Sequence, residues 1–238
     1  KAGNFNGDDI IDIIVQQPAT AQFVCRHLYN FFVADEPQVP AWSVTPPRDP
    51  EAVDILAKVF VESNYDMRSV LRVLFNSKFF KESRFTRLKS PAEVVISTLR
   101  LAGGSEFPGP GLGNLARQTG YMGQDLVNPP SVEGWHTGSE WINSGSLMRR
   151  TNFFADLVGE IERPGIKAII SNLKARGDLS PEQLVDGCLD LMGPLDIDGG
   201  SREELVSHAT EDGPVRWGNN GLSEKRVGQM LQLIVSLR

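Results

Sequence analysis

The stretch Ser90-Pro-Ala-Glu-Val-Val-Ile-Ser-Thr-Leu-Arg-Leu101 decides the fold class. Ser90 followed three residues later by Glu93 is typical of a helix N-terminal capping box, and Pro91 suits the first helical turn. The apolar residues that follow recur at helical spacing, which predicts a helix over residues 91–101. The same pattern occurs in Ser180-Pro-Glu-Gln183 and predicts a second helix over residues 181–192.

Helix signals of this kind recur along almost the whole chain, and the alternation typical of strands is nearly absent. Asp8 or Asp9 is expected to cap the first helix, and Ser201 a late helix over residues 202–210. Residues 35–50 hold five of the fifteen prolines and are expected to form an extended crossing segment. We therefore predict an all-α fold, an irregular bundle of about nine or ten helices.

One long excursion rich in Gly, Pro and Trp interrupts the helices over residues 105–143. It contains four of the fifteen prolines and two of the four tryptophans. A loop of this length in a compact domain is usually functional or held by its own side chains. We therefore expect residues 1–238 to form one helical region. A subdivision would place the main core and the Trp-rich loop in residues 1–160, and acidic helices in residues 161–238.

The composition excludes several classes of protein. The chain has 238 residues, of which 40% are hydrophobic and 23% charged, enough for a full core without disulfides or metals. No run of about 18 apolar residues occurs, so no transmembrane segment is expected. Cys25 and Cys188 lie in separate apolar helical settings and are predicted to be buried free thiols rather than a bridge. A collagen, a disordered tail, a disulfide mini-protein and an integral membrane protein are excluded.

Charge is unevenly distributed along the sequence. The net charge of −6 argues against general nucleic-acid binding. Residues 178–212 hold ten acids and a single base, Arg202. By contrast, five bases face one acid, Glu82, in a basic series formed by Lys78, Lys81, Arg84, Arg87 and Lys89. Such asymmetry is typical of an electrostatic contact surface, although two solvated faces that merely differ are the alternative.

The basic series alternates with Phe79, Phe80 and Phe85. This interleaving suits an anionic polymer or a lipid surface. The alternative is a connector between helices whose phenylalanines plug the core, and the short segment favours that alternative.

The densest group of candidate binding residues lies at the end of the excursion. Aromatic faces stack on sugar rings while carboxylates and amides bond hydroxyl groups, so this group could line a carbohydrate site. Glu133 and Glu140 could then act as the paired carboxylates of a glycosidase. The alternative is that the two tryptophans anchor the loop, with their indole N–H groups bonded to its carbonyls. The candidates are Glu133, Trp135, His136, Glu140, Trp141, Asn143 and Arg150.

No sequence motif identifies a metal site or a cofactor. The histidines lack the spacing of zinc ligands, and neither a phosphate-binding Gly-rich loop nor a nucleophile elbow is present. Asp196-Ile-Asp198-Gly-Gly200 begins like a calcium loop, but Ser207 stands where a bidentate Glu is required. We interpret it as a turn and a helix cap, and predict no metal and no cofactor.

The chain resembles a bacterial protein family, the domain-of-unknown-function family number 1800. The resemblance covers nearly the whole chain, and the Gly-Gln…Pro-Pro-Ser-Val-x-Gly-Trp block is its most specific part. It implies the C-terminal half of a longer helical protein, in keeping with a start at Lys1 rather than Met. It also implies export, because members are often encoded beside a secreted sulfatase-like family, and it supplies no catalytic residues. The matching segments are residues 7–21, 79–93, 123–135, 141–143 and 226–233.

These observations lead to two hypotheses. The first is a non-enzymatic, exported helical scaffold or binding protein that acts with another protein, such as a sulfatase-like partner, at the cell envelope. The second is a carbohydrate-active or other hydrolase that uses Glu133, His136 and Glu140, with Trp135 and Trp141 as stacking platforms. A binder of anionic polymers through the basic series is a third class, whose affinity would fall steeply with salt.

Overall fold

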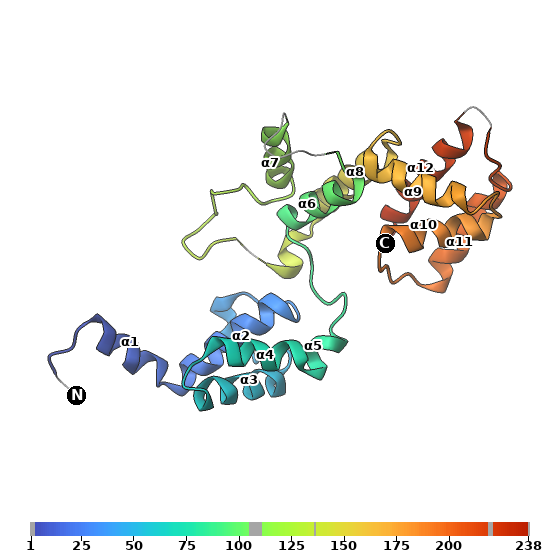
Figure 1. The fold of residues 1–238 in the computed structure, drawn as a ribbon. Helices are drawn as coiled ribbons and strands as arrows, with labels where there is room; N and C mark the ends of the chain where they lie inside the picture. Colours follow the sequence, from blue (N-terminus) through green and yellow to red (C-terminus); the bar gives the residue numbers. More distant parts are fainter. Residues whose placement is uncertain (1–2, 105–110, 136, 219–220, 238) are drawn as a thin grey trace. The chain divides into compact units, whose positions relative to one another are not determined.

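The computed structural model describes residues 3–104, 111–135, 137–218 and 221–237 (Figure 1). Within these residues the chain forms twelve α-helices, two short 3-10 helices and no strand. The prediction of an all-α fold is therefore confirmed, while the expected count of nine or ten helices was slightly low.

The helices fall into two compact units. Unit 1 comprises Lys1–Lys89 and His136–Trp141, and unit 2 comprises Ser90–Trp135 and Ile142–Arg238. The main division thus lies between residues 89 and 90, whereas the charge pattern suggested a boundary near residue 160. The two units are described separately below.

Unit 1 is built on three helices that pack in sequence order, α2 against α3 and α3 against α4. Their apolar stripes meet in a core that contains Cys25, Leu56 and Leu74, each with no exposed surface. The helices of unit 1 are α1 (Gly7–Val15), α2 (Pro18–Phe32), η1 (Val39–Ser43), α3 (Pro50–Glu62), α4 (Met67–Asn76), α5 (Lys78–Glu82) and η2 (Gly138–Trp141).

Two elements of unit 1 differ from the sequence prediction. The cap of α1 is Asn6, whose side chain accepts hydrogen bonds from the backbone N–H groups of Asp8 (2.8 Å) and Asp9 (3.0 Å). The two acids expected to cap the helix therefore lie in its first turn, where their negative charges interact favourably with the positive end of the helix dipole. The segment expected to be extended contains η1, because Pro40 can occupy the first turn of a short helix.

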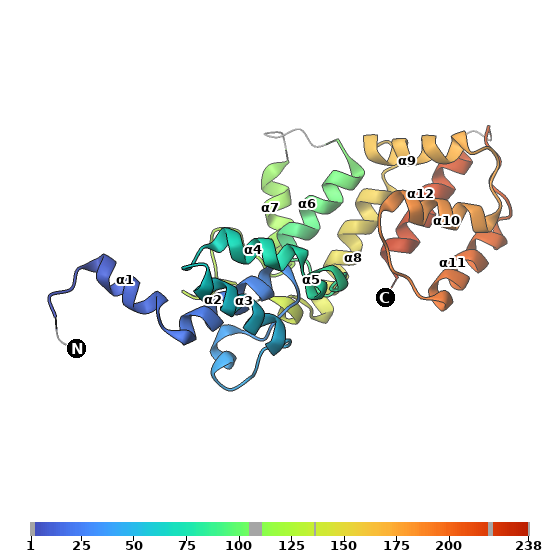
Figure 2. The ribbon, with the colours of Figure 1, turned by 60° about the horizontal axis from the view of Figure 1, so that its bottom comes forward.

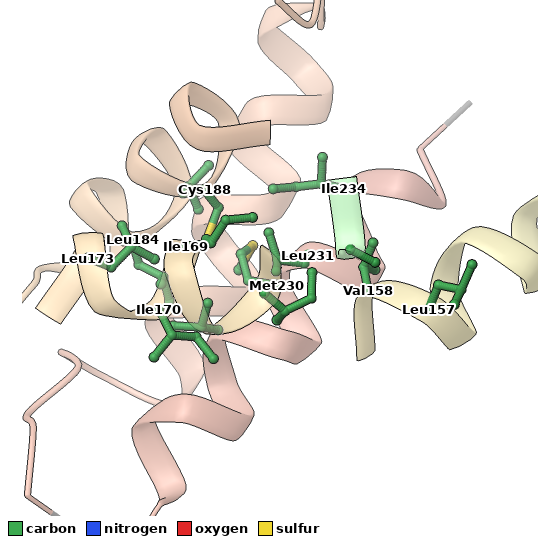
Figure 3. Close-up of a cluster of buried hydrophobic side chains, with 14 of the residues drawn as sticks. Leu157, Val158, Ile169, Ile170, Leu173, Leu184, Cys188, Met230, Leu231 and Ile234 are labelled. Carbon is green, nitrogen blue, oxygen red and sulfur yellow. The ribbon is translucent and has the colours of Figure 1, made fainter. Parts of the chain in front are cut away.

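Unit 2 packs α8 against α12, α6 against α8 and α9, and α10 against α11 and α12. One apolar cluster, part of which is drawn in Figure 3, includes Leu157 from α8, Leu173 from α9 and Leu231 from α12. The helices of unit 2 are α6 (Pro91–Ala102), α7 (Leu112–Tyr121), α8 (Ser144–Gly159), α9 (Pro164–Ala175), α10 (Pro181–Met192), α11 (Gly199–Glu211) and α12 (Leu222–Val235).

The helix starts of unit 2 follow their caps closely. Ser90 and Ser180 each form the predicted capping box, with Glu93 and Gln183 respectively. The start of α11 was placed wrongly: Asp198, not Ser201, is its cap, and its carboxylate accepts from the Ser201 backbone N–H at 2.9 Å.

Two further predictions concern the whole chain. Cys25 and Cys188 are buried free thiols, as expected. None of the described helices is both long and apolar enough to cross a membrane.

Candidate functional site

The candidate residues of the excursion are distributed over both units. Glu140 and Trp141 belong to unit 1, whereas Glu133, Trp135, Asn143 and Arg150 belong to unit 2. His136 lies outside the described residues. The structure therefore does not assemble these candidates within a single unit.

In unit 1, Trp141 ends the short helix η2 with only 7% of its surface exposed. The segment is held at two points: the side-chain amide of Gln38 donates to the Thr137 carbonyl at 3.2 Å, and Gly138 lies against Asp35. Stacking on a sugar requires an exposed ring face. The burial of Trp141 instead matches the alternative in which this indole anchors the segment, while the neighbouring Glu140 is exposed.

In unit 2, residues 123–135 form a loop that we call the apolar loop. Its N-terminal end is fixed, because the Gln124 side chain accepts from the Ala92 backbone N–H at 2.9 Å and Met122 is buried. Nearer the tip, the Asn128 side-chain amide donates to Asp125 at 2.9 Å. An isolated β-bridge between Ser131 and Gly134 closes the tip of the loop.

The apolar loop presents aliphatic side chains to solvent. Val127 is 94% exposed and Val132 is fully exposed, while Leu126 is 40% exposed. Val127 has a φ of +67°, a left-handed conformation that a β-branched residue rarely adopts. The exposure of these residues was not predictable from the sequence, because turn signals predict a loop but not which of its side chains are exposed.

Trp135 is the other candidate residue in this loop. Its indole nitrogen is buried and has no hydrogen-bond acceptor among the described residues, so the expected bond to a loop carbonyl is absent there. Two tryptophans that were not candidates make such bonds: Trp42 donates to the Pro37 carbonyl at 2.7 Å and Trp217 to the Gly177 carbonyl at 2.8 Å. Tryptophan anchoring is thus used in this protein at other positions.

Asn143 and Arg150 both belong to helix α8. Asn143 is the helix cap, and its side chain accepts from the Ser146 backbone N–H at 2.9 Å. It lines a shallow pocket of about 280 Å³ together with Tyr121 and Arg149, whose guanidinium lies 5.3 Å from the Tyr121 ring centroid. Arg150 is buried, and burial lowers the pKa of its guanidinium from the usual value.

The basic series lies in unit 1 and is partly occupied by internal contacts. Lys78 pairs with Glu82 at 3.7 Å on the exposed side of α5. Arg87 lies 3.8 Å from the Asp35 carboxylate and donates to the Phe31 carbonyl. These bases therefore contribute less free charge to the surface than their number indicates.

The remaining bases of the series, Lys81, Arg84 and Lys89, have exposed side chains. Phe79 and Phe80 pack against the core of unit 1, as the connector alternative predicted. That alternative was wrong for Phe85, which is exposed, has a φ of +60° and lies 5.5 Å beneath the guanidinium of Arg84.

Among the described residues, no three His, Cys, Asp or Glu side chains cluster in a way that would hold a metal ion. Asp198 caps helix α11, in keeping with the interpretation of residues 196–200 as a turn and a helix cap, although the sequence had placed the cap of this helix at Ser201. Its hydrogen bonds from the Ser201 backbone and hydroxyl lower the pKa of the Asp198 carboxyl.

The chain was compared with known proteins. A protein-family model described as "Protein of unknown function (DUF1800)" matches residues 1–235. Searches of curated proteins and of solved structures found no match.

Proposed function

The chain belongs to the DUF1800 family of proteins of unknown function, and we propose that it is an exported helical binding protein whose apolar loop docks a partner protein at the cell envelope. The observation that carries this proposal is the exposure of Val127 and Val132 on a loop with a fixed base.

Exposed aliphatic side chains favour the formation of a complex only when a partner buries them. Burying one valine side chain contributes about 1.5 kcal/mol or more. Full burial of Val127 and Val132 by a partner would therefore favour binding by about 3 kcal/mol, which is more than a hundredfold in affinity. Two such side chains at the tip of one loop could enter an apolar pocket of a partner and contribute most of the binding energy, as a few residues do in many protein interfaces.

The loop is also held in a defined conformation before binding. The hydrogen bonds of Gln124 and Asn128 and the bridge between Ser131 and Gly134 restrict its backbone. A partner would then meet an ordered loop, so little conformational entropy is lost on docking. The positive φ of Val127 supports the same interpretation, because strained residues are retained where the local conformation has a use.

The proposed location and partner class rest on the family resemblance. Because related proteins are often encoded beside a secreted sulfatase-like family, a sulfatase-like protein is the partner to test first. The partner would present an apolar pocket rather than a charged surface, because residues 126–132 contain no charged side chain.

The test compares partner binding by the wild-type chain and by the double variant V127S/V132S. Val44 is 84% exposed in unit 1, so V44S is a matched control for the loss of an exposed valine. Binding to the purified sulfatase-like neighbour is measured by titration calorimetry, and envelope and cytosolic fractions are probed for the protein. We expect V127S/V132S to weaken binding at least tenfold and V44S to leave it unchanged. Equal affinities for all three proteins, or a cytosolic location, would overturn the proposal.

The hydrolase alternative makes a different prediction. It requires the carboxylates of Glu133 and Glu140, whereas partner docking does not. A double variant E133Q/E140Q that binds the partner as tightly as the wild-type protein supports docking. Hydrolysis of a glycan by the wild-type protein that this variant abolishes would instead support the enzyme.

A further inference from the structure

Helix α1 is amphipathic, yet none of its residues is buried. At 100° per residue, Ile10, Ile11, Ile13 and Ile14 fall on one side of the helix, and each is 43–59% exposed. Asp8 and Asp9 flank this apolar side, and Asp12 lies opposite it. In both views of the ribbon, α1 extends away from the helices that form the core of unit 1 (Figures 1 and 2).

A helix of this length is not stable in isolation. Isolated helices shorter than about 12 residues are marginal in water, and most helices are stabilised by packing of their apolar side. The capping box of Asn6 and Asp9 favours the start of α1 but covers none of its isoleucines. The apolar side of α1 is therefore suited to a second surface.

Unit 1 itself carries a surface of the complementary kind. Four phenylalanines from α2, α4 and α5 form a continuous row: the ring centroids of Phe31 and Phe32 are 4.7 Å apart, those of Phe32 and Phe75 5.0 Å, and those of Phe75 and Phe80 5.2 Å. Phe31 is 62% exposed and Phe75 39% exposed, so the row is accessible at its end and in its middle.

One base contacts this aromatic row, and two more are exposed near its members along the same helices. Arg87 places its guanidinium 5.5 Å from the ring centroid of Phe31. Arg72 is exposed one turn before Phe75 on α4, and Lys81 is exposed next to Phe80 on α5. We call this surface the aromatic–basic patch: Phe31, Phe32, Arg72, Phe75, Phe80, Lys81 and Arg87.

We propose that the apolar side of α1 docks on the aromatic–basic patch of a second copy of the chain. The isoleucines would cover the phenylalanines, and Asp8 and Asp9 would face the bases at the edge of the patch. This is the helix-in-groove type of recognition, in which an amphipathic helix lies on an apolar surface and the flanking charges select the partner.

The geometry of unit 1 favours a second copy over the chain's own patch. Helix α1 is nine residues long and so about 13 Å, and it joins α2 through Gln16 and Gln17. Phe31 lies about 20 Å along α2 from Pro18. A helix folded back on its own α2 would end short of Phe31.

Pairing of two α1 helices is disfavoured by charge. Residues 7–15 contain three acids and no base, so two copies of α1 would repel each other. The contact between α1 and the patch is instead heterologous, because the two surfaces differ. Each copy then offers one free α1 and one free patch, and the assembly grows into a ring or an open chain.

The test measures the mass of the purified 238-residue chain in solution. We expect the weight-average mass from sedimentation equilibrium to rise above the monomer value of 26.2 kDa with increasing protein concentration. Salt at about 0.5 M should shift the association to higher concentration, because the flanking charges are exposed. A mass that stays at the monomer value at every concentration would overturn the proposal.

Charge reversal then identifies the surfaces. The variants D8K on α1, which keeps the capping box of Asn6 and Asp9, and R72E/K81E on the patch should each associate more weakly alone than the wild-type chain. An equal mixture of the two should associate more strongly than either variant alone, since reversed α1 then meets reversed patch. The control is E203K/E204K, which reverses two exposed acids of α11 and should assemble like the wild-type chain.

Two outcomes of this experiment would contradict the proposal. One is a 1:1 mixture of D8K and R72E/K81E that associates no more strongly than either variant alone, although circular dichroism shows both variants folded. The other is assembly of R72E/K81E alone at the same concentrations as the wild-type chain, which would show that the aromatic–basic patch is not the contact surface. V127S/V132S, which removes the apolar loop side chains, should assemble normally, so this proposal can fail independently of the proposed function.

Discussion

Arg26 and Glu36 form an ion pair of 2.6 Å in the core of unit 1, where their side chains are 6% and 0% exposed. The remaining polar atoms of the pair are also bonded. Arg26 donates to the carbonyls of Thr45 (2.9 Å) and Pro46 (3.0 Å), and Glu36 accepts from the Arg48 backbone N–H at 2.7 Å. The pair therefore attaches α2 to the irregular chain between α2 and α3.

Removal of one charge from this pair is expected to be costly. Glu36→Gln leaves the Arg26 guanidinium buried without a counter-charge and should lower the free energy of unfolding of unit 1 by about 3–5 kcal/mol. Hydrogen exchange of the α2 amides measures this loss. Glu62→Gln breaks the exposed Lys58–Glu62 pair of 3.9 Å and should cost less than about 1 kcal/mol. Similar losses of stability in Glu36→Gln and Glu62→Gln would contradict the conclusion that the Arg26–Glu36 pair is buried and holds unit 1 together.

A close backbone approach in unit 2 predicts a second sensitive position. A Cβ on Gly165 would lie 2.0 Å from the Leu101 carbonyl oxygen, so α9 could no longer pack on α6. Gly165→Ala should lower the stability of unit 2 by about 3 kcal/mol. Gly113→Ala in α7 is the control, because nothing lies within 4 Å of its Cβ position and the helix gains up to about 1 kcal/mol. Urea denaturation compares the two, and a tolerated Gly165→Ala would show that the helices can separate.

A substitution at Val127 should affect stability and partner binding in opposite directions. Its φ of +67° is strained for valine and ordinary for glycine. Val127→Gly should therefore raise the stability of unit 2 by about 1 kcal/mol while weakening the proposed partner binding. Val132 has no positive φ, so Val132→Gly should weaken binding without that gain in thermal stability. A Val127→Gly variant that is destabilised would show that the loop conformation is not strained.

His27 predicts a loss of stability in mildly acidic solution. Its ring lies 4.5 Å from Phe23 and 4.6 Å from Trp42, and burial lowers the pKa of His27 from 6.5. The unfolded chain therefore takes up a proton more readily than the folded one. Stability should be full above pH 6.5 and fall as the pH drops through the folded pKa.

His27→Phe tests the origin of this dependence. Thermal midpoints measured between pH 7.5 and about pH 5 should fall for the wild-type protein and stay level for the variant. Hydrogen bonds lower the pKa values of Asp66 and Asp198 below the ordinary value of 3.8. The contribution of these two carboxylates to stability is therefore lost only in more strongly acidic solution. A decline in His27→Phe equal to that of the wild type would assign the effect to another group.

The two thiols should be unreactive in the folded protein. Burial raises the pKa of both Cys25 and Cys188 to about 12, so almost no thiolate exists near neutral pH. A disulfide reagent at pH 8 should label neither cysteine in the native protein and both in about 6 M guanidinium chloride. Rapid labelling without denaturant would indicate that the core opens.

Local features of the fold were predictable from the sequence because their causes are local. Ser90 and Ser180 each cap the helix that their capping box predicted. The caps at Asn6 and Asp198 were misplaced because several neighbouring residues can cap a helix and only backbone geometry selects one. Helix α5 was missed because five residues give little periodicity, although Ser77 caps it through the Phe80 N–H at 3.1 Å.

The candidate site was less predictable because exposure depends on residues distant in sequence. Trp141 and Val132 both lie in the excursion, yet one is buried and the other fully exposed. Turn signals indicate where a loop lies but not which of its side chains the rest of the fold covers. The aromatic row of Phe31 and Phe75 likewise depends on how α2 and α4 pack.

The return of residues 136–141 to unit 1 has a consequence for biosynthesis. Unit 1 is not a continuous piece of chain, since its last segment follows Trp135 of unit 2. As the ribosome makes the chain from its N-terminus, Asp35 and Gln38 emerge well before Gly138 and Thr137, their neighbours in unit 1. Unit 1 therefore cannot be completed during translation until Trp141 has left the exit tunnel, and a nascent chain arrested at Lys89 would lack part of its first unit.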